Sequence, residues 1–383
     1  MLRNVTAALT QVLTIGMGWF GEEPGGLNRM YAGLLGSMTG RGVGVRGLVA
    51  GSPQAEAPPV SLSFFARREV PAVWRLRACR RAVRAALSTD QVDVIAAHFA
   101  LYALPVLDLL EERRFVFHFH GPWSGESRAE GESGINVFVK RAIESRVYRR
   151  ADRFIALSSA FARILERQYE ISRDRIFVVP GGVDADRYCL RGTRRDARER
   201  LQLPSDRPLI VSVRRLIHRV GLEGLIDAMV EVRKSAPEAL LLIAGRGAKG
   251  RELAGRIEAR GLEDHVRLLG FVAEDDLPWL YRACDVSIVP SVALEGFGLP
   301  TIESLASGTP VLVTPVGGLP ETVAELDPGL VLRDPSTRAL ADGMIRALRD
   351  AGGLPPPDAC ARYVREHFHW PVIARKVLAV YEQ

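Results

Sequence analysis

Short apolar segments alternate with longer amphipathic segments along most of the chain. The apolar segments predict buried strands at 12–17, 43–51, 92–99, 114–121 and 153–158, and again at 209–216, 239–245, 266–271, 285–290 and 309–315. Segments with helical periodicity separate most of them, for example 100–111, 136–149, 221–235 and 336–350. Strands that lack a clean polar alternation are buried on both faces, which predicts parallel sheets covered by helices. The pattern therefore predicts an α/β fold in which the strand–helix series occurs twice.

The break between the two series is expected at "VVPGGVDADRY" (178–188), which a strongly basic stretch follows. Its proline and glycines favour a turn. We place the boundary at about residue 190, between an N-terminal domain (1–190) and a C-terminal domain (191–369). The last segment, 370–383, is expected to be a helix. In open parallel sheets ligands bind beyond the carboxyl ends of the strands, so two such domains that face each other form a binding cleft.

Composition narrows the class of partner. Hydrophobic residues make up 47% of the chain and charged residues 25%, as in packed globular proteins. No apolar run reaches the roughly 18 residues that span a bilayer, and "QVLTIGM" fits a first buried strand better than a signal peptide. The four cysteines lie far apart, which fits a reducing cytoplasm and predicts neither a disulfide framework nor a zinc site. The net charge of +6 suits anionic partners such as nucleotides or phospholipid surfaces, whereas no nucleic-acid motif is present.

Two glutamates bracket a glycine-rich turn in "LEGFGLPTIES" (294–304). The strand at 285–290 comes before this turn, and a helix with Pro300 in its first turn follows it. Backbone N–H groups at such a helix start can bind an anion. Glu303, about one turn into the helix, could accept hydrogen bonds from the vicinal hydroxyls of a ribose, and Glu295 lies before the turn. We interpret the pair as a ligand site rather than as two solvated acids.

This segment resembles the donor-site signature of the retaining glycosyltransferases of family four, which have the two-domain GT-B fold. The best match is "EGFGLPTIESLASGTPVLVTPVGGLPETV" (295–323); "VVPGGVDADRY", "LLIAGRG", "RLLGFV" and "EEPGGLNRM" extend the resemblance over most of the chain. The resemblance implies that Glu303 holds the ribose and Glu295 faces the donor sugar. It also implies that the final helix crosses back to the N-terminal domain. The contacts that it implies with the sugar, the diphosphate and the base come from Gly245, Phe271, Val272, Gly296, Phe297, Gly298 and Leu299.

The segment "VSVRRLIHRVG" (211–221) departs from that family. The family shows Gly-Arg-Leu, three residues and then Lys-Gly, and its two cations neutralise the diphosphate as it leaves, where negative charge grows in the transition state. Here Arg215 occupies the arginine position but Val220 occupies the lysine position. Arg219 is the first candidate for the second cation, and His218 and Lys249 are weaker candidates.

Histidines end two of the predicted strands. In "FHFHGPW" (117–123), we expect His118 and His120 to point to opposite faces of the strand. His120, just before a Gly-Pro turn, resembles the family histidine that contacts the donor sugar, where a neutral imidazole can hydrogen-bond a hydroxyl. His118 is interpreted as structural. His98, at the end of another strand, is a candidate for the acceptor side.

Two further segments are candidates for binding. Gly25 and Gly26 precede a predicted helix, whose first backbone amides could contact the diphosphate or the acceptor. The helix predicted at 71–87 has apolar residues on one side and arginines beside them. A surface helix is the simpler interpretation, and peripheral contact with an anionic membrane is the alternative.

Taken together, the sequence predicts a metal-independent, retaining glycosyltransferase without a cofactor. It would move a hexose from a UDP- or GDP-sugar to a hydroxyl of a small molecule, a polysaccharide or a lipid-linked acceptor. The catalytic residues would be His120, Arg215, Arg219 and Glu295. A cytoplasmic location is expected, with possible contact at the inner face of the membrane. The alternatives are a pseudo-glycosyltransferase or a nucleotide-sugar epimerase of the same fold, or a non-catalytic nucleotide-sugar-binding protein, which Val220 would favour.

Overall fold

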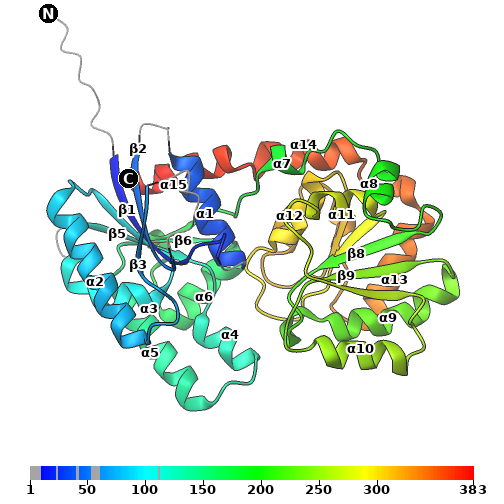
Figure 1. Cartoon of the computed structure of the whole chain (residues 1–383), viewed down its shortest axis with the longest axis horizontal. Coiled ribbons are helices and arrows are strands. Elements are labelled where there is room, and N and C mark those ends of the chain that lie inside the picture. The colour runs from blue at the N-terminus through cyan, green and yellow to red at the C-terminus, as the bar shows by residue number, and fades with distance from the viewer. Residues whose placement is uncertain (1–9, 23–24, 40–42, 53–60, 111–112) are drawn as a thin grey trace, which may run out of the picture. The chain divides into compact units, whose positions relative to one another are not determined.

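A computed structural model describes residues 10–22, 25–39, 43–52, 61–110 and 113–383 (Figure 1). The leading residues 1–9 and part of the predicted Gly-Gly loop lie outside the described residues. The chain divides into two compact units. Unit 1 comprises 1–124, 134–182 and 370–383, and unit 2 comprises 125–133 and 183–369. The division therefore falls after Gly182, and the last helix is grouped with unit 1.

Unit 1 contains a seven-stranded sheet in the order β3-β2-β1-β4-β5-β6-β7, and its paired strands are parallel. The strands are β1 (Thr10–Gly18), β2 (Val43–Ala50), β3 (Leu62–Ala66), β4 (Val94–Ala97), β5 (Arg114–Phe119), β6 (Arg153–Ala156) and β7 (Ile176–Val178). The prediction of parallel, doubly covered strands is confirmed here. The predicted strands missed β3 and β7, which are short and lie at the two edges of the sheet.

Helices cover both faces of this sheet. One hydrophobic cluster lies under α2 (Ala72–Thr89), α3 (Ala100–Ala103), α5 (Gly134–Arg150) and α6 (Ser159–Tyr169). A second cluster lies under α1 (Gly26–Met38) and α15 (Trp370–Glu382), which pack side by side (Figure 1). The helix predicted at 100–111 is a single α-turn followed by a 3-10 helix, Leu104–Leu110, because Pro105 lacks the N–H that an α-helix needs.

The apolar side of α2 is part of this core. Cys79 and Val83 are fully buried, and Leu76 and Leu87 pack against the same cluster. The side predicted for contact with a membrane is therefore occupied by the protein itself. The outward side of α2 carries exposed arginines, such as Arg81, and at its start the exposed side chain of Trp74.

Unit 2 contains a five-stranded sheet in the order β10-β9-β8-β11-β12, again with parallel pairs. The strands are β8 (Leu209–Val213), β9 (Leu240–Ala244), β10 (Val266–Gly270), β11 (Val286–Val289) and β12 (Val311–Val313). The α-helices are α7 (Ala185–Tyr188), α8 (Arg194–Arg200), α9 (Leu222–Ser235), α10 (Gly250–Ala259), α11 (Leu277–Ala283), α12 (Leu299–Ala306), α13 (Thr337–Arg349) and α14 (Pro357–His367). A short helix, α4 (Trp123–Ala129), spans the junction of the two units in sequence.

The two sheets share one topology. In each, the first strand lies inside the sheet, the next two strands follow on one side and the fourth strand pairs on the other side. The direction of winding reverses between β1 and β4 in unit 1, and between β8 and β11 in unit 2. Ligands of doubly wound sheets bind at the carboxyl ends of the strands that flank such a reversal. The fold therefore directs attention to the residues that follow these strands.

Candidate functional site

In unit 2, the start of α12 lies directly beyond β11. Gly298 is the N-cap residue, with φ of 81°, and Pro300 lies in the first turn. An added Cβ at Gly298 would approach Leu319 to 2.4 Å, so both the backbone and the space require glycine. Glu303 lies about one turn further and is only 4% exposed; the Tyr281 hydroxyl donates a hydrogen bond of 3.2 Å to its carboxylate. This is a buried acceptor group beside a helix start that can bind an anion.

The backbone around Glu295 is tightly held. Leu294, just before it, has φ of 49°, a strained conformation for a side chain of this kind. The N–H of Gly318 donates to the Glu295 carbonyl at 2.9 Å, and a Cβ at Gly317 would lie 1.8 Å from the same oxygen. These contacts fix the direction in which the Glu295 side chain leaves the turn.

The Glu295 carboxylate is bound by a residue that the sequence prediction missed. Arg214 follows β8 and forms a salt bridge to Glu295, and Ser291 donates a 2.9 Å hydrogen bond to the same oxygen. The two side chains of the salt bridge are 8% and 12% exposed. Burial raises the pKa of Glu295, but the Arg214 charge and hydrogen bond outweigh it and lower this pKa overall. Arg214 occupies the position of the glycine in the family's Gly-Arg-Leu pattern. This replacement is the sequence feature that could have predicted an additional cation at the site.

The two arginines predicted for the diphosphate differ in their surroundings. Arg215 reaches the surface, and its pKa is lowered by partial burial and by the charge of Arg219. Arg219 is 8% exposed; it donates to the Leu294 carbonyl at 3.0 Å and lies 3.5 Å from a Glu126 oxygen. Burial raises the pKa of Glu126, against the opposing charges of Arg219 and Arg215. The cations after β8 thus share one electrostatic environment with the acids.

The residues weighed as replacements for the family lysine have other partners. Val220 is 2% exposed and belongs to the core. Lys249 pairs with Glu223 at 2.7 Å and with Glu252 at 2.8 Å. His218 also contacts Glu223, at 3.3 Å. Of the three candidates for the second cation, Arg219 is the one that lies with Arg215 and Glu295.

The remaining predicted donor residues follow β9, β10 and β11. Gly245 has φ of 143°, and a Cβ there would lie 1.9 Å from the Arg214 carbonyl oxygen, so the backbone after β9 passes close to the backbone after β8. Phe271, which Val272 follows in sequence, is 50% exposed, with the Arg246 guanidinium 5.5 Å from its ring centre. Phe297 is 4% exposed and packs on the Phe368 ring, so its backbone is the part that a ligand could reach.

In unit 1, Gly25 and Gly26 begin α1, just beyond β1. Gly25 is the N-cap residue and supplies no side chain to cap the helix, and Gly26 is exposed. Among the described residues, a Cβ at Gly25 would meet nothing within 4 Å, so no described side chain or backbone crowds this position.

The expectation that His118 and His120 point to opposite faces is wrong. Side chains in a strand repeat with a period of two, so residues two apart share a face, and the rings of these two histidines lie 6.4 Å apart with nearly parallel planes. His98, which follows β4, joins them: its Nδ1 lies 2.9 Å from His120 Nε2. His98 is 3% exposed. The structure thus brings together the three histidines that were interpreted separately.

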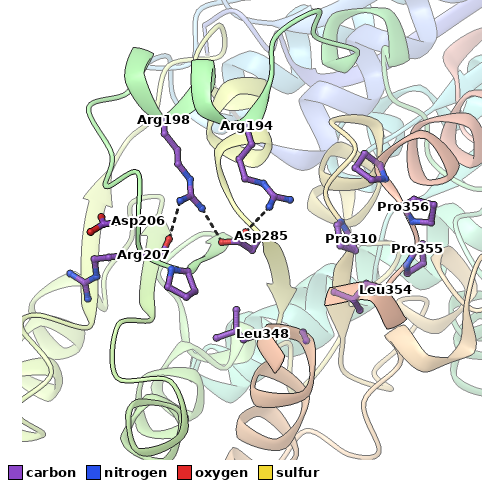
Figure 2. A pocket seen from close by; sticks show the side chains of 14 residues that line it. Arg194, Arg198, Asp206, Arg207, Asp285, Pro310, Leu348, Leu354, Pro355 and Pro356 are labelled. Carbon is purple, nitrogen blue, oxygen red and sulfur yellow. Dashed lines mark hydrogen bonds and ion pairs between the residues drawn. The ribbon is translucent and has the colours of Figure 1, made fainter. Parts of the chain in front are cut away.

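A cavity of about 570 Å³ in unit 2 lies elsewhere (Figure 2). Pro208, Asp285 and Pro310 line it, and each comes just before a strand, so it is at the amino ends of β8, β11 and β12. Arg198, labelled in Figure 2, is committed to Asp285 and to the carbonyls of neighbouring residues. This cavity is remote from the glycine-rich turn and its acids.

The architecture of the two units and the turn before α12 define a class. Two Rossmann-like parallel sheets of this order are the GT-B architecture. Residues 193–367 match the family model described as Glycosyl transferases group 1, and residues 24–187 match the one described as Glycosyltransferase Family 4. The chain belongs to the family-four glycosyltransferases of the GT-B fold.

Named relatives agree with this membership. The chain is 37% identical over 250 residues to D-inositol 3-phosphate glycosyltransferase of Xylanimonas cellulosilytica. The aligned region covers 63% of this chain and 59% of that protein. Among solved structures it is similar to sucrose-phosphate synthase of Thermosynechococcus elongatus, with a TM-score of 0.82, 24% identity and 98% of both chains covered. It is also similar to Anabaena HepE in complex with UDP-glucose, with a TM-score of 0.78, 21% identity and 97% and 99% coverage.

Proposed function

We propose that the chain is a retaining glycosyltransferase that moves a hexose from a UDP- or GDP-sugar to a hydroxyl group. The acceptor would be a small molecule, a polysaccharide or a lipid-linked sugar. The observation that carries the proposal is the set of residues around the carboxyl ends of β8 and β11. There a buried carboxylate, Glu303, the start of α12 and a group of cations occur together in unit 2. Nucleotide-sugars offer the matching groups: a ribose diol, a diphosphate and a sugar.

Each group of the donor has a proposed partner. Glu303 accepts hydrogen bonds from the ribose hydroxyls, and the backbone from Gly296 to Leu299 meets the diphosphate and the sugar at the start of α12. Glu295, kept ionised by Arg214, accepts hydrogen bonds from sugar hydroxyls. The backbone at Gly245, Phe271 and Val272 passes the base. From unit 1, His120 contributes a hydrogen bond to the sugar, and the amides after Gly25 and Gly26 contact the diphosphate or the acceptor.

The proposed reaction is a front-face displacement. The bond between the anomeric carbon and the diphosphate oxygen breaks, and the acceptor oxygen bonds to the anomeric carbon on the same face. The acceptor proton passes to the departing phosphate oxygen. Arg215 and Arg219 stabilise the negative charge that grows on the diphosphate, without a metal ion and without a cofactor. Trapping of a covalent glycosyl-enzyme intermediate would contradict this mechanism.

Two alternatives within the fold differ in what is joined. A pseudo-glycosyltransferase would couple non-sugar units, and an epimerase would act on the nucleotide-sugar with no acceptor; the structure of the product separates them from the proposal. A non-catalytic binding protein is favoured by one residue, Val220, in the lysine position. Turnover of any donor would exclude it.

The test is a thermal-shift series with UDP-glucose, UDP-N-acetylglucosamine and GDP-mannose on the wild type, Glu303→Ala and a matched control, Glu258→Ala. Glu258 is exposed on α10, away from the turn. A ligand at 100 times its Kd stabilises the native state by about 2.7 kcal/mol, so we expect a clear upward shift for one donor. The shift should vanish in Glu303→Ala and persist in Glu258→Ala. If no donor shifts the wild type, the proposed donor site is wrong.

We also propose a cytoplasmic protein with peripheral contact at an anionic membrane face, supported by a helix other than the one expected from the sequence. The outward side of α5 carries Ile135, Phe138 and Val139, which are 79%, 74% and 49% exposed. Arg146 and Arg149 continue the same exposed side toward the end of the helix. Apolar side chains followed by basic ones fit the interface of an anionic bilayer. None of the described helices is long and apolar enough to cross a membrane.

A further inference from the structure

Two buried histidines and one half-buried histidine form one cluster at the reversal point of the unit 1 sheet. His98 follows β4, His118 lies in β5 and His120 follows β5. The rings of His98 and His118 stack with centres 4.1 Å apart and planes 16° apart. His98 Nδ1 faces His120 Nε2 at 2.9 Å. The cluster is therefore a continuous contact from the core to the histidine that is proposed to meet the sugar.

Aromatic side chains of α1 and α15, the two helices that cover one face of the sheet, contact the cluster. The Tyr381 hydroxyl of α15 lies 2.6 Å from His118 Nε2. The Tyr31 ring of α1 meets His98 edge-on at 5.0 Å, and its hydroxyl donates to the Thr14 carbonyl. Within the part of the chain that the structure describes, the ionisable groups that contact the three imidazoles from the packed elements are these two phenols and the imidazoles themselves. Burial lowers the pKa of all three, to about 4 for His120.

The facing nitrogens restrict how the hydrogens are placed. A neutral imidazole has one N–H donor and one acceptor nitrogen, and only one of two nitrogens that face each other at 2.9 Å can carry hydrogen. If His98 donates from Nδ1, His120 keeps its hydrogen on its own Nδ1. If His120 donates from Nε2, its Nδ1 is an acceptor. The state of His98 thus determines what His120 can offer to a ligand.

We propose that His98 is a positioning residue that fixes the ring orientation and the single neutral tautomer of His120, with His118 and Tyr381 holding His98 in place. The proposal rests on the proposed function for the role of His120 toward substrate. It differs from the acceptor contact expected for His98 from the sequence, because its ring is buried and its Nδ1 is committed to His120. Partners that orient a functional histidine through its second nitrogen set its tautomer in the same way in other sites.

The first test needs no substrate. Long-range proton–nitrogen NMR spectra of the full chain with ¹⁵N-labelled histidine report the tautomer and charge of each ring between pH 5 and 8, and single substitutions assign the seven histidines. We expect His120 to be neutral with one fixed tautomer in the wild type and to show mixed tautomers in His98→Leu. His98→Asn, which can keep a hydrogen-bonding group near the Nδ1 position, should restore one tautomer. A mixed tautomer of His120 in the wild type, or no change in His98→Leu, would overturn the proposal.

The second test measures turnover with the donor that the thermal-shift series identifies. We expect His98→Leu to lower kcat by about 10- to 100-fold, as removal of such orienting partners does, with little change in KM for the donor. His98→Asn should recover most of the loss, and Tyr381→Phe should lose less. His265→Leu, in unit 2, is the matched control and should keep wild-type kcat. If no donor binds, the proposed function fails while the NMR result still decides the positioning role; an equal kcat in all variants would contradict that role.

Discussion

The reversal points of the two sheets carry opposite kinds of chemistry on the same topology. In unit 1, His98 after β4 stacks on His118 in β5, and His120 follows β5. Burial lowers the pKa of these imidazoles and keeps them neutral. In unit 2, Arg214 after β8 forms a buried salt bridge with Glu295 after β11, and this arginine lowers the pKa of Glu295 and keeps its carboxylate ionised. Strand order therefore fixes where a site forms, and the residue types at the strand ends decide its electrostatics.

This difference suits the two parts of a nucleotide-sugar. In the proposed function, Arg215 and Arg219 of unit 2 supply the fixed positive charge that a diphosphate needs. In the same proposal, His120 offers sugar hydroxyls a neutral group that donates or accepts a hydrogen bond according to its tautomer, whereas Glu295 offers them a charged acceptor. Because charged pairs and neutral buried imidazoles respond in different ways to mutation and pH, the comparison can be tested in each unit separately.

The largest effect is expected from Arg214→Met. Removing one partner of a buried salt bridge leaves the other charge uncompensated and commonly costs about 3 kcal/mol or more. We expect this loss in the free energy of unfolding of unit 2 at pH 7, measured by urea denaturation, together with a raised pKa of Glu295. The double variant Arg214→Met with Glu295→Gln should recover part of the loss. Equal stability of Arg214→Met and the wild type would show that the salt bridge is dispensable.

The next largest effect is expected from acid, which should lower the stability of unit 1 at a higher pH than the stability of unit 2. Unfolded histidines take up protons below about pH 6.5, whereas His120 in the folded unit stays neutral down to about pH 4. The unfolded state therefore binds more protons in this window, so the stability of unit 1 falls as the pH drops. Between pH 6.5 and 5 the loss from His120 is about 1.6 kcal/mol, because the unfolded imidazole is only half protonated at pH 6.5 and the slope then rises toward 1.36 kcal/mol per pH unit. The lowered pKa of Glu295 stabilises unit 2 above about pH 4.3 and is lost only below it.

Amide hydrogen exchange at pH 6.5 and 5, corrected for the intrinsic exchange rate, measures this order. Protection of β4 and β5 should fall while protection of β8 and β11 holds. His120→Gln removes one titrating ring and should reduce the pH dependence in unit 1. Simultaneous loss of protection in both units at pH 5 would contradict the electrostatic difference between them.

The sequence predicted most of the framework because buried parallel strands leave continuous apolar runs. The edge strands β3 and β7 were missed because β3 has partly buried residues and β7 is only three residues long. The turn before α12 was recognised because two glutamates bracket its glycines and Pro300 suits a first helical turn; the structure adds that Gly298 has a positive φ. Local rules of this kind can be read from consecutive residues.

The contacts that the sequence did not predict join distant strands. Arg214 and Glu295 are 81 residues apart, so only the pairing of β8 with β11 explains why they meet. The histidine cluster likewise depends on β4 lying beside β5 and on α15 packing under the same sheet. The wrong expectation for His118 and His120 did not come from a missing long-range contact. It misapplied the period of two in a strand, which places residues two apart on the same face.

A smaller effect is expected from Tyr281→Phe, which removes the hydroxyl that donates to Glu303 and keeps the ring. A hydrogen bond to a charged group contributes about 1.5 kcal/mol or more. We expect the free energy of unfolding of unit 2 to fall by about that amount and the donor to bind several-fold more weakly, by urea denaturation and titration calorimetry. Tyr363→Phe, on α14, is the control ring. Unchanged donor affinity in Tyr281→Phe would mean that this hydroxyl does not orient Glu303 for the ribose.

The smallest effect is expected on the surface of unit 1, where α5 carries exposed apolar side chains and exposed arginines on the same side. Phe138→Ser replaces an exposed apolar side chain of α5. Full transfer of such a side chain into an apolar environment contributes about 1.5 to 3 kcal/mol, and partial insertion at an interface contributes less. We expect a several-fold weaker association with vesicles that contain phosphatidylglycerol, measured by co-sedimentation, and no change in thermal stability. Phe271→Ser, at an exposed aromatic of unit 2, is the matched control. Because Arg146 and Arg149 supply charge on the same side of α5, raising the salt concentration should weaken the wild type and Phe138→Ser alike. Equal binding to purely zwitterionic vesicles would contradict the membrane contact through this basic side.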